Sequence, residues 1–228
     1  MEKETEIDPW EVFFQIMSFL SGKLPKESNA YKYLMKYMAF LGKNQYERLG
    51  FNDVGTMIDK IKREYFLSLF CKVQDKTCIG NATEHFQAWM EDPKNVDIPP
   101  NLRNVVYYYG VRLGGVKEWD FLYSQYNETK DPYTKNKILY GLSATNDPWI
   151  TDRFDNNPTL AYLNVVSRLT TGFDTLYALS EFQRFQAQIE VSDESALKSI
   201  RERIKWLEKH EKEIEDVLEE LLKKNHQM

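Results

Sequence analysis

The sequence predicts an all-α protein, and two observations carry this prediction. Apolar residues recur at three- and four-residue spacing along most of the 228 residues, which is the period of a helix that buries one face. No segment shows the sustained alternation of apolar and polar residues that a half-buried strand requires. The helical segments, of roughly ten to fifteen residues, are joined by short turns, as in proteins built from packed helix pairs.

Four helices are expected in the first part of the chain. The first, WEVFFQIMSFL from Trp10 to Leu20, is apolar nearly all round, as a buried helix is. The second covers Tyr31 to Leu41, and the third runs to Leu69 with Asp53 as its N-cap. The fourth covers Thr83 to Met90, and the prolines that follow it end the helical pattern.

The stretch PPNLRNVVYYYGVRLGGVKEWDF contains a glycine pair that allows two interpretations. Gly114-Gly115 is either the start of a phosphate-binding loop or a turn between two helices. A phosphate loop needs a strand before its glycines and a helix N-terminus after them. Because Leu102 to Leu113 has the apolar face of a helix, we expect a turn, followed by a helix whose face includes Trp119 and Tyr126.

The second half of the chain continues the helical pattern, and its last helix allows two interpretations. An apolar row flanked by alternating charges is typical of a helix that caps the end of a stack, which we favour, or of a coiled-coil seam for a partner helix. Loosely similar helix pairs without a strict repeat predict an α-solenoid, a right-handed superhelix of antiparallel pairs. The expected segments are Tyr133–Leu142, a helix that begins at Asp147-Pro148-Trp149, Leu160–Leu169, Leu176–Phe185 and Ser192–Leu222.

Charge and hydropathy exclude several classes of partner. Thirty basic and 35 acidic residues give a net charge of −5, and no basic stripe is present, which argues against nucleic-acid binding. No run reaches the roughly 18 apolar residues that span a bilayer, and the N-terminus lacks the pattern of a secretory signal. We therefore expect either a cytoplasmic protein, if Met1 is the native start, or an internal fragment of a longer chain.

Catalytic and metal-binding motifs are absent from the sequence. The helix motif of zinc proteases needs a second histidine four residues after the first. Four residues after His210 the chain has Ile214 in place of that second histidine. No nucleophile elbow, P-loop or EF-hand loop occurs. We therefore predict no catalytic residue and no metal ligand in this chain.

Two cysteines and two sequons bear on the compartment. Cys71 and Cys78 are either two unrelated buried thiols or a local disulfide, which would require an oxidising compartment. Asn81 and Asn127 each begin a glycosylation sequon, Asn-Ala-Thr and Asn-Glu-Thr. Two sequons in a chain of this length are close to chance, so the residues alone leave both questions open.

Several motifs along nearly the whole chain occur together in one order. They are KETEIDPWEVFFQIMSFLSG, YERLGFN, the cysteine pair, ATEHFQAWM, IPPNLRNVVYYYGVRLGGVKEWDFLYSQY, SRLTTGFDTLYALSEFQRF and IRERIKWLEKHEKEIEDVL. This series resembles the C-terminal helical domain of zinc aminopeptidases of the aminopeptidase N family. The resemblance implies one HEAT-like superhelical domain over residues 1–228 that lies over a catalytic domain, encloses the substrate cavity and shapes the access of peptides.

The resemblance also implies where the chemistry of the parent protein lies. In that family the zinc motif HExxH and the exopeptidase motif GxMEN lie upstream, and neither occurs here, so this chain alone is not expected to hydrolyse peptides. Zinc is expected only in the parent's catalytic domain. The family's cysteine pair falls on Cys71 and Cys78, which implies a disulfide. Membrane-anchored or secreted members carry glycans, which supports Asn81, Asn127 and a location on the extracellular face of a membrane or in a secretory lumen.

Two arginines within the matching motifs are candidates for the substrate cavity. Arg103 and Arg168 would engage a peptide's carboxylates, and the alternative is that they form ion pairs between neighbouring helices. The expected partners are the catalytic domain, peptide substrates and, in a homodimer, a second copy. Near 149–152 the chain departs from the family by passing directly into TDRF, as if helices were deleted there. The competing functions are a stand-alone interaction scaffold and an enzyme with an unrecognised site.

Overall fold

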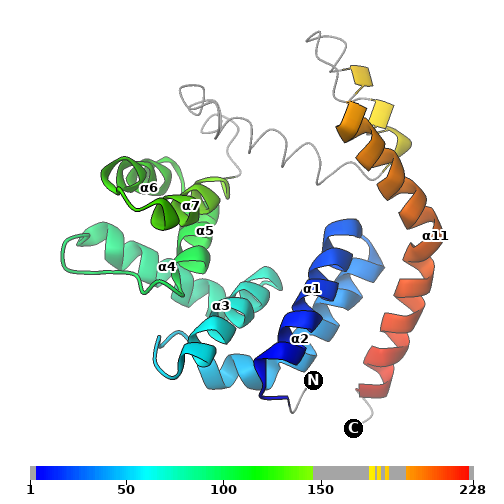
Figure 1. The fold of residues 1–228 in the computed structure, drawn as a ribbon, viewed down its shortest axis with the longest axis horizontal. Coiled ribbons are helices and arrows are strands. Elements are labelled where there is room, and N and C mark those ends of the chain that lie inside the picture. The colour runs from blue at the N-terminus through cyan, green and yellow to red at the C-terminus, as the bar shows by residue number, and fades with distance from the viewer. Residues whose placement is uncertain (1–3, 146–174, 178, 181–182, 185–193, 226–228) are drawn as a thin grey trace. The chain divides into compact units, whose positions relative to one another are not determined.

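All regular secondary structure in the described residues is helical, which confirms the all-α prediction (Figure 1). The computed structural model describes residues 4–145, 175–177, 179–180, 183–184 and 194–225. The predicted helix Leu160–Leu169 and the junction near 149–152 lie outside these residues, and the right-handed superhelix remains a prediction. The helices are α1 (Ile7–Lys23), α2 (Asn29–Leu49), α3 (Met57–Lys72), α4 (Lys76–Glu91), α5 (Arg103–Leu113), α6 (Val116–Glu128), α7 (Pro132–Leu142) and α11 (Glu194–Asn225).

The chain forms two compact units, whose division falls inside α2. One unit combines residues 1–7 with 42–164, and the other combines residues 8–41 with 165–228. Helices α3 to α7 belong to the first unit, whereas α1, the first part of α2 and α11 belong to the second. None of the described helices is both long and apolar enough to cross a bilayer.

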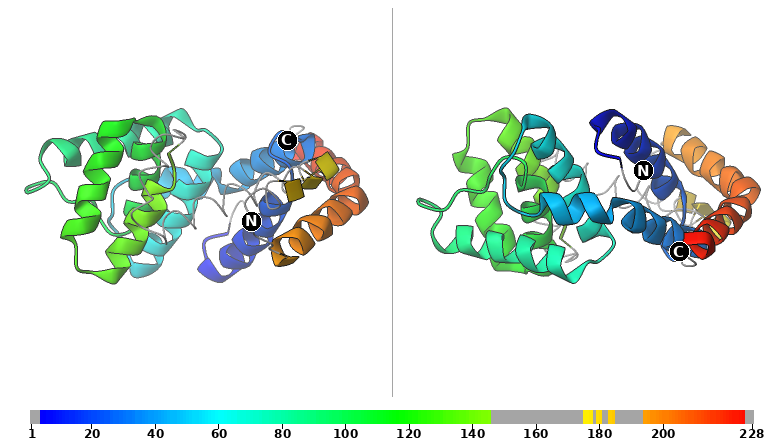
Figure 2. Two further views of the ribbon diagram at one scale, coloured as in Figure 1. Left: turned by 90° about the horizontal axis from the view of Figure 1, so that it is seen from above. Right: turned by 90° about the horizontal axis from the view of Figure 1, so that it is seen from below.

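Helix α5 lies at the centre of the first unit. It packs against α3, α4, α6 and α7. Short turns join α3 to α4, α5 to α6 and α6 to α7, whereas the longer segment 92–102 joins α4 to α5 (Figure 2). Its contact with α4 is very close, because a Cβ added at Gly110 would lie 2.2 Å from Cγ of Phe86. Trp89 of α4 stacks on Tyr107 of α5, with ring centroids 5.1 Å apart. Interlocking rings and one residue without a side chain thus hold α4 against α5.

Helix α3 begins later than predicted, because the wrong residue was taken as its N-cap. The N-cap is Thr56, whose hydroxyl accepts from the backbone N–H of Asp59 at 3.1 Å, while the Asp59 carboxylate accepts from the backbone N–H of Thr56 at 3.1 Å. This reciprocal pair is a capping box. Asp53 instead accepts hydrogen bonds from Arg63 at 3.2 Å and Asn101 at 3.1 Å. The carboxylate of Asp53, predicted to cap the helix, therefore binds side chains from other parts of the chain.

Helix α4 is longer than predicted at its N-terminus. Its N-cap is Asp75, whose side chain accepts from the backbone N–H of Cys78 at 2.8 Å. The predicted segment Thr83 to Met90 is therefore the second half of this helix.

The glycine pair forms the predicted turn between two helices. Gly114 is the C-cap of α5, and Gly115 precedes the first residue of α6. A Cβ at Gly114 would lie 2.6 Å from the carbonyl oxygen of Gly110, so the chain has no room there for a side chain. The carboxylate of Glu118 accepts from the backbone N–H of Gly115 at 2.7 Å and closes the start of α6. This geometry excludes the phosphate-loop interpretation, since a helix precedes the glycines.

In the second unit, the long helix α11 buries its apolar row within the chain. Near its start the Arg203 Nε donates to the carbonyl of Lys23 at 3.0 Å, and Trp206 meets Phe19 of α1 edge-on at 5.9 Å between centroids. This packing favours the capping interpretation over a seam for a partner helix. The buried apolar residues of α11 are Leu197, Ile200, Ile204, Leu207 and Leu218.

Candidate functional site

Of the two arginines proposed for the substrate cavity, the structure describes one. Arg103 begins α5 and donates to the carbonyl of Ile98 at 2.8 Å, the hydroxyl of Thr134 at 3.1 Å and the carboxylate of Asp97 at 3.3 Å. These contacts within the chain are of the kind expected if Arg103 forms an ion pair between neighbouring segments. A role of Arg103 in binding a substrate remains a prediction. Arg168 lies outside the described residues.

The two cysteines lie at disulfide distance. Cys71 is in the last turn of α3 and Cys78 in the first turn of α4, and both are fully buried. Their Sγ atoms are 2.15 Å apart and their Cα atoms 5.1 Å apart. The oxidising compartment that this pairing would need remains a prediction.

The two sequons lie in different surroundings. Asn81 is half-buried within α4, and its side-chain amide donates to the carbonyl of Thr77 at 2.8 Å. Asn127 is exposed near the end of α6. Glycosylation of either residue remains a prediction. In the described part of the chain, no cluster of three or more histidine, cysteine or acidic residues is arranged to hold a metal ion.

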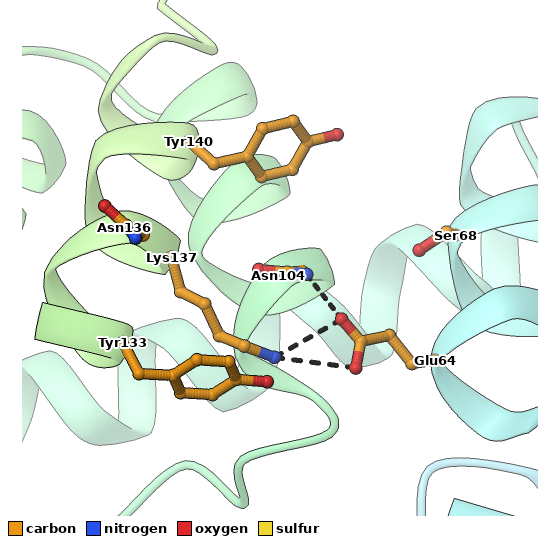
Figure 3. A pocket seen from close by; sticks show the side chains of 7 residues that line it. All are labelled: Glu64, Ser68, Asn104, Tyr133, Asn136, Lys137 and Tyr140. Carbon is orange, nitrogen blue, oxygen red and sulfur yellow. Dashed lines mark hydrogen bonds and ion pairs between the residues drawn. The ribbon is translucent and has the colours of Figure 1, made fainter. Parts of the chain in front are cut away.

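Three helices of the first unit line a pocket of about 390 Å³ (Figure 3). Residues one turn apart on a helix share a face, so positions 64 and 68 of α3 and positions 133, 136, 137 and 140 of α7 each point in one direction. Helix α5 contributes Asn104 between them. The lining residues are Glu64, Ser68, Asn104, Tyr133, Asn136, Lys137 and Tyr140.

The floor of this pocket, which we call the α3–α5–α7 pocket, is an ion pair. The Nζ of Lys137 lies 3.3 Å and 3.5 Å from the two carboxylate oxygens of Glu64, and it also donates to the carbonyl of Pro100 at 2.9 Å. Asn104 donates from its side-chain amide to the Oε1 of Glu64 (Figure 3). The side chain of Lys137 is 7% exposed and that of Glu64 is 28% exposed, so the carboxylate is the member that solvent reaches.

The walls of the pocket are aromatic and exposed. Tyr133 and Tyr140 are 60% and 52% exposed, and their rings extend from α7 on either side of the ion pair (Figure 3). The Nζ of Lys137 lies 5.0 Å from the ring centroid of Tyr133, within the range of a cation–π contact. Tyr140 stacks on Tyr108 of α5 with centroids 5.1 Å apart. The rings are therefore held in place while much of their surface remains available.

This arrangement of an ion pair, amides and hydroxyls can bind a ligand. Its lining residues include no cysteine and no histidine. Sequence reasoning missed the pocket because Glu64, Asn104 and Lys137 are far apart in the chain.

Comparison with known proteins connects this fold to a family. Residues 1–157 match the ERAP1-like C-terminal domain. The chain belongs to this family. It is 30% identical over 155 residues to glutamyl aminopeptidase of Bos taurus and 28% identical over 165 residues to aminopeptidase Q of Homo sapiens, each match covering 68% of the chain. It is also 26% identical over 160 residues, 67% of the chain, to aminopeptidase N of Oryctolagus cuniculus.

These matches confirm the resemblance to the C-terminal domain of the aminopeptidase N family. They cover 16% of the length of each of these relatives, so the chain corresponds to one part of such a protein. The family match ends at residue 157, and the motifs noted beyond it, including that of the last helix, remain a resemblance.

Proposed function

We propose that this chain acts as the non-catalytic C-terminal domain of a zinc aminopeptidase, where it encloses a cavity that holds peptide substrates. Membership of the ERAP1-like C-terminal domain family supports the first part of the proposal. The observation that carries the second part is the α3–α5–α7 pocket, a polar recess between exposed tyrosines. The zinc and the bond-breaking residues would belong to the catalytic domain of the parent protein, which is the expected partner.

The chemistry of the pocket suits an extended peptide. A peptide in extended form has main-chain donors and acceptors that need partners, which hydroxyl and amide side chains supply. Ser68 and Asn136 are exposed at the pocket, and the two tyrosines add hydroxyls and apolar ring surface. Tyrosine provides a large contact area at a small entropic cost, because its side chain has few rotatable bonds. The pocket therefore favours unfolded peptide over the closed surface of a folded protein.

Site-specific photo-crosslinking tests this proposal. A photoreactive amino acid is placed at Ser68, on the pocket face of α3, or at Ser124, on the exposed surface of α6, in the full 228-residue chain. Extended peptides should crosslink at position 68 and much less at position 124, and the chain alone should not cleave aminoacyl reporters. Equal crosslinking at both positions would contradict the proposal, and preferential capture of folded proteins would favour an interaction scaffold.

A further inference from the structure

The charged member of the α3–α5–α7 pocket that solvent reaches, Glu64, keeps unused capacity as a hydrogen-bond acceptor. The Oε1 of Glu64 accepts from both Asn104 and Lys137, whereas among the described residues its Oε2 accepts only from Lys137, at 3.5 Å. An ionised carboxylate offers about four lone-pair positions, so Oε2 can accept further hydrogen bonds. The amide nitrogen of Asn104 uses one of its two hydrogens on Glu64, so the amide oxygen and the second hydrogen are left for a ligand. A ligand that presents hydrogen-bond donors can therefore bind this carboxylate.

The lysine of the pocket is not available to bind an anion. The Nζ of Lys137 contacts both oxygens of Glu64 and the carbonyl of Pro100, and it lies over the ring of Tyr133. These contacts engage its three hydrogens, and the side chain is 7% exposed. An incoming carboxylate would therefore meet the exposed Glu64 without a free cation to offset the repulsion. The pocket disfavours acidic groups.

The aromatic walls favour a planar cation. Lys137 already shows that this site holds a cation at 5.0 Å from a tyrosine ring. Tyr140 is held by its stack on Tyr108 and is 52% exposed, which leaves ring surface for a second contact. A guanidinium can stack on an aromatic ring while it donates several hydrogen bonds in its own plane, whereas an ammonium cannot do both in one geometry.

We propose that the α3–α5–α7 pocket receives the arginine side chain of an extended peptide. The guanidinium donates to the Oε2 of Glu64 and is flanked by the exposed rings of Tyr133 and Tyr140 (Figure 3). This assignment rests on the proposed function for the presence of a peptide, and it adds the chemical class that the pocket selects. A volume of about 390 Å³ is within the range of ligand pockets, about 300 to 1,000 Å³, and the net charge of −5 attracts cations over a longer distance.

Binding of two matched peptides to the full chain tests the proposal. A fluorescent extended peptide with one arginine is compared, by anisotropy, with the same peptide carrying citrulline, which keeps the shape and removes the charge. The arginine peptide should bind about tenfold more tightly, as expected for one charge-assisted hydrogen bond with an exposed carboxylate. Glu64→Gln should remove the difference, and the control Glu84→Gln, on the exposed side of α4, should retain it.

A second variant covers the case in which Glu64→Gln fails to fold. Ser68→Arg places a guanidinium at an exposed position one helical turn from Glu64. This new side chain should bind Glu64 itself, and so compete with the arginine of the peptide and remove the preference for it. An unchanged tenfold preference in this variant overturns the inference. Equal binding of the two peptides by the unmodified chain also overturns it, while crosslinks at position 68 continue to support the proposed function. Without peptide binding and without crosslinks, both proposals are wrong.

Discussion

Two neighbouring residues of α3, Arg63 and Glu64, belong to ion pairs that differ in how far solvent reaches them. Arg63 lies in a closed site: its side chain is 2% exposed, and its donors reach the carbonyls of Leu49 at 3.1 Å, Gly50 at 3.2 Å and Val54 at 2.8 Å, and the carboxylate of Asp53 at 3.2 Å. These acceptors engage the guanidinium on several sides, so the cation holds the loop between α2 and α3 in place. No lining residue of the α3–α5–α7 pocket belongs to this closed site.

Glu64 lies in an open site by contrast. Lys137, the cation that pairs with Glu64, is almost as buried as Arg63. The two carboxylates differ more, since the side chain of Glu64 is 28% exposed and that of Asp53 is 10% exposed. The difference teaches that a buried cation does not by itself indicate a structural or a functional site. What separates the two is whether the anion keeps acceptor capacity that solvent or a ligand can reach.

The largest expected effect contrasts the two buried cations. Arg63→Met should lower the free energy of unfolding of the first unit by about 4 kcal/mol, because it leaves several buried carbonyls without their donor and removes the cation that pairs with Asp53. Lys137→Met should cost about 1 to 2 kcal/mol, because Glu64 keeps Asn104 and solvent. Hydrogen exchange of the amides in α3 to α7 measures both values. Equal losses would remove the distinction between a closed and an open site.

The next effect tests how closely α4 packs against α5. Gly110→Ala should destabilise the first unit by about 3 kcal/mol, because the new Cβ would overlap the ring of Phe86. Gly80→Ala is the matched control: Gly80 is within α4 and has no atom within 4 Å of an added Cβ, so alanine should stabilise by about 0.5 to 1 kcal/mol. A neutral Gly110→Ala variant would show that α4 and α5 can separate.

A smaller effect concerns the cysteine pair at the end of α3. The double variant Cys71→Ala, Cys78→Ala should lose about 2 kcal/mol relative to the oxidised chain, because a disulfide over so short a loop restricts the unfolded state only modestly. Non-reducing peptide mapping of protein from its native compartment should recover the two cysteines in one linked peptide. Free thiols in that material would argue against the extracellular or lumenal location and for a cytoplasmic one.

The smallest expected effect concerns the Arg48–Asp59 ion pair, which is more exposed than the two pairs compared above. The hydrogen bond from Thr56, together with the contact to Arg48, holds the pKa of Asp59 at about 2, below its ordinary value of 3.8. Asp59→Asn should cost at most about 1 kcal/mol at pH 7, since the ion pair is open to solvent.

The pH dependence of this effect has a defined sign. A carboxyl with a depressed pKa in the folded state contributes stability that is fully present above the unfolded pKa and is lost as pH falls through the folded pKa. The difference between the chain and its Asp59→Asn variant should therefore shrink from about pH 4 toward pH 2. Urea unfolding at a series of pH values measures it, and a difference that grows on acidification would contradict the assigned cause.

Local sequence was enough to predict that the segments now described as helices are helical, and to predict the turn at Gly114-Gly115. Helical periodicity depends on which residues are three and four positions apart, and a helix closes its hydrogen bonds over the same distance. The N-cap of α3 was predicted wrongly for a related reason. Asp53 and Thr56 are both good caps, and the choice between them depended on Arg63 and Asn101, the second of which is 48 residues away in the chain.

By itself, the sequence determined the fold class and the family, since periodicity and ordered motifs are properties of the linear chain. Only the tertiary structure decided which charges meet. Glu64 and Lys137 are separated by 73 residues, and no spacing rule relates two helices that come together through a third. Packing of α3 and α7 against α5 placed the pair side by side and left the Glu64 side chain 28% exposed, and the assignment of the pocket depends on that carboxylate.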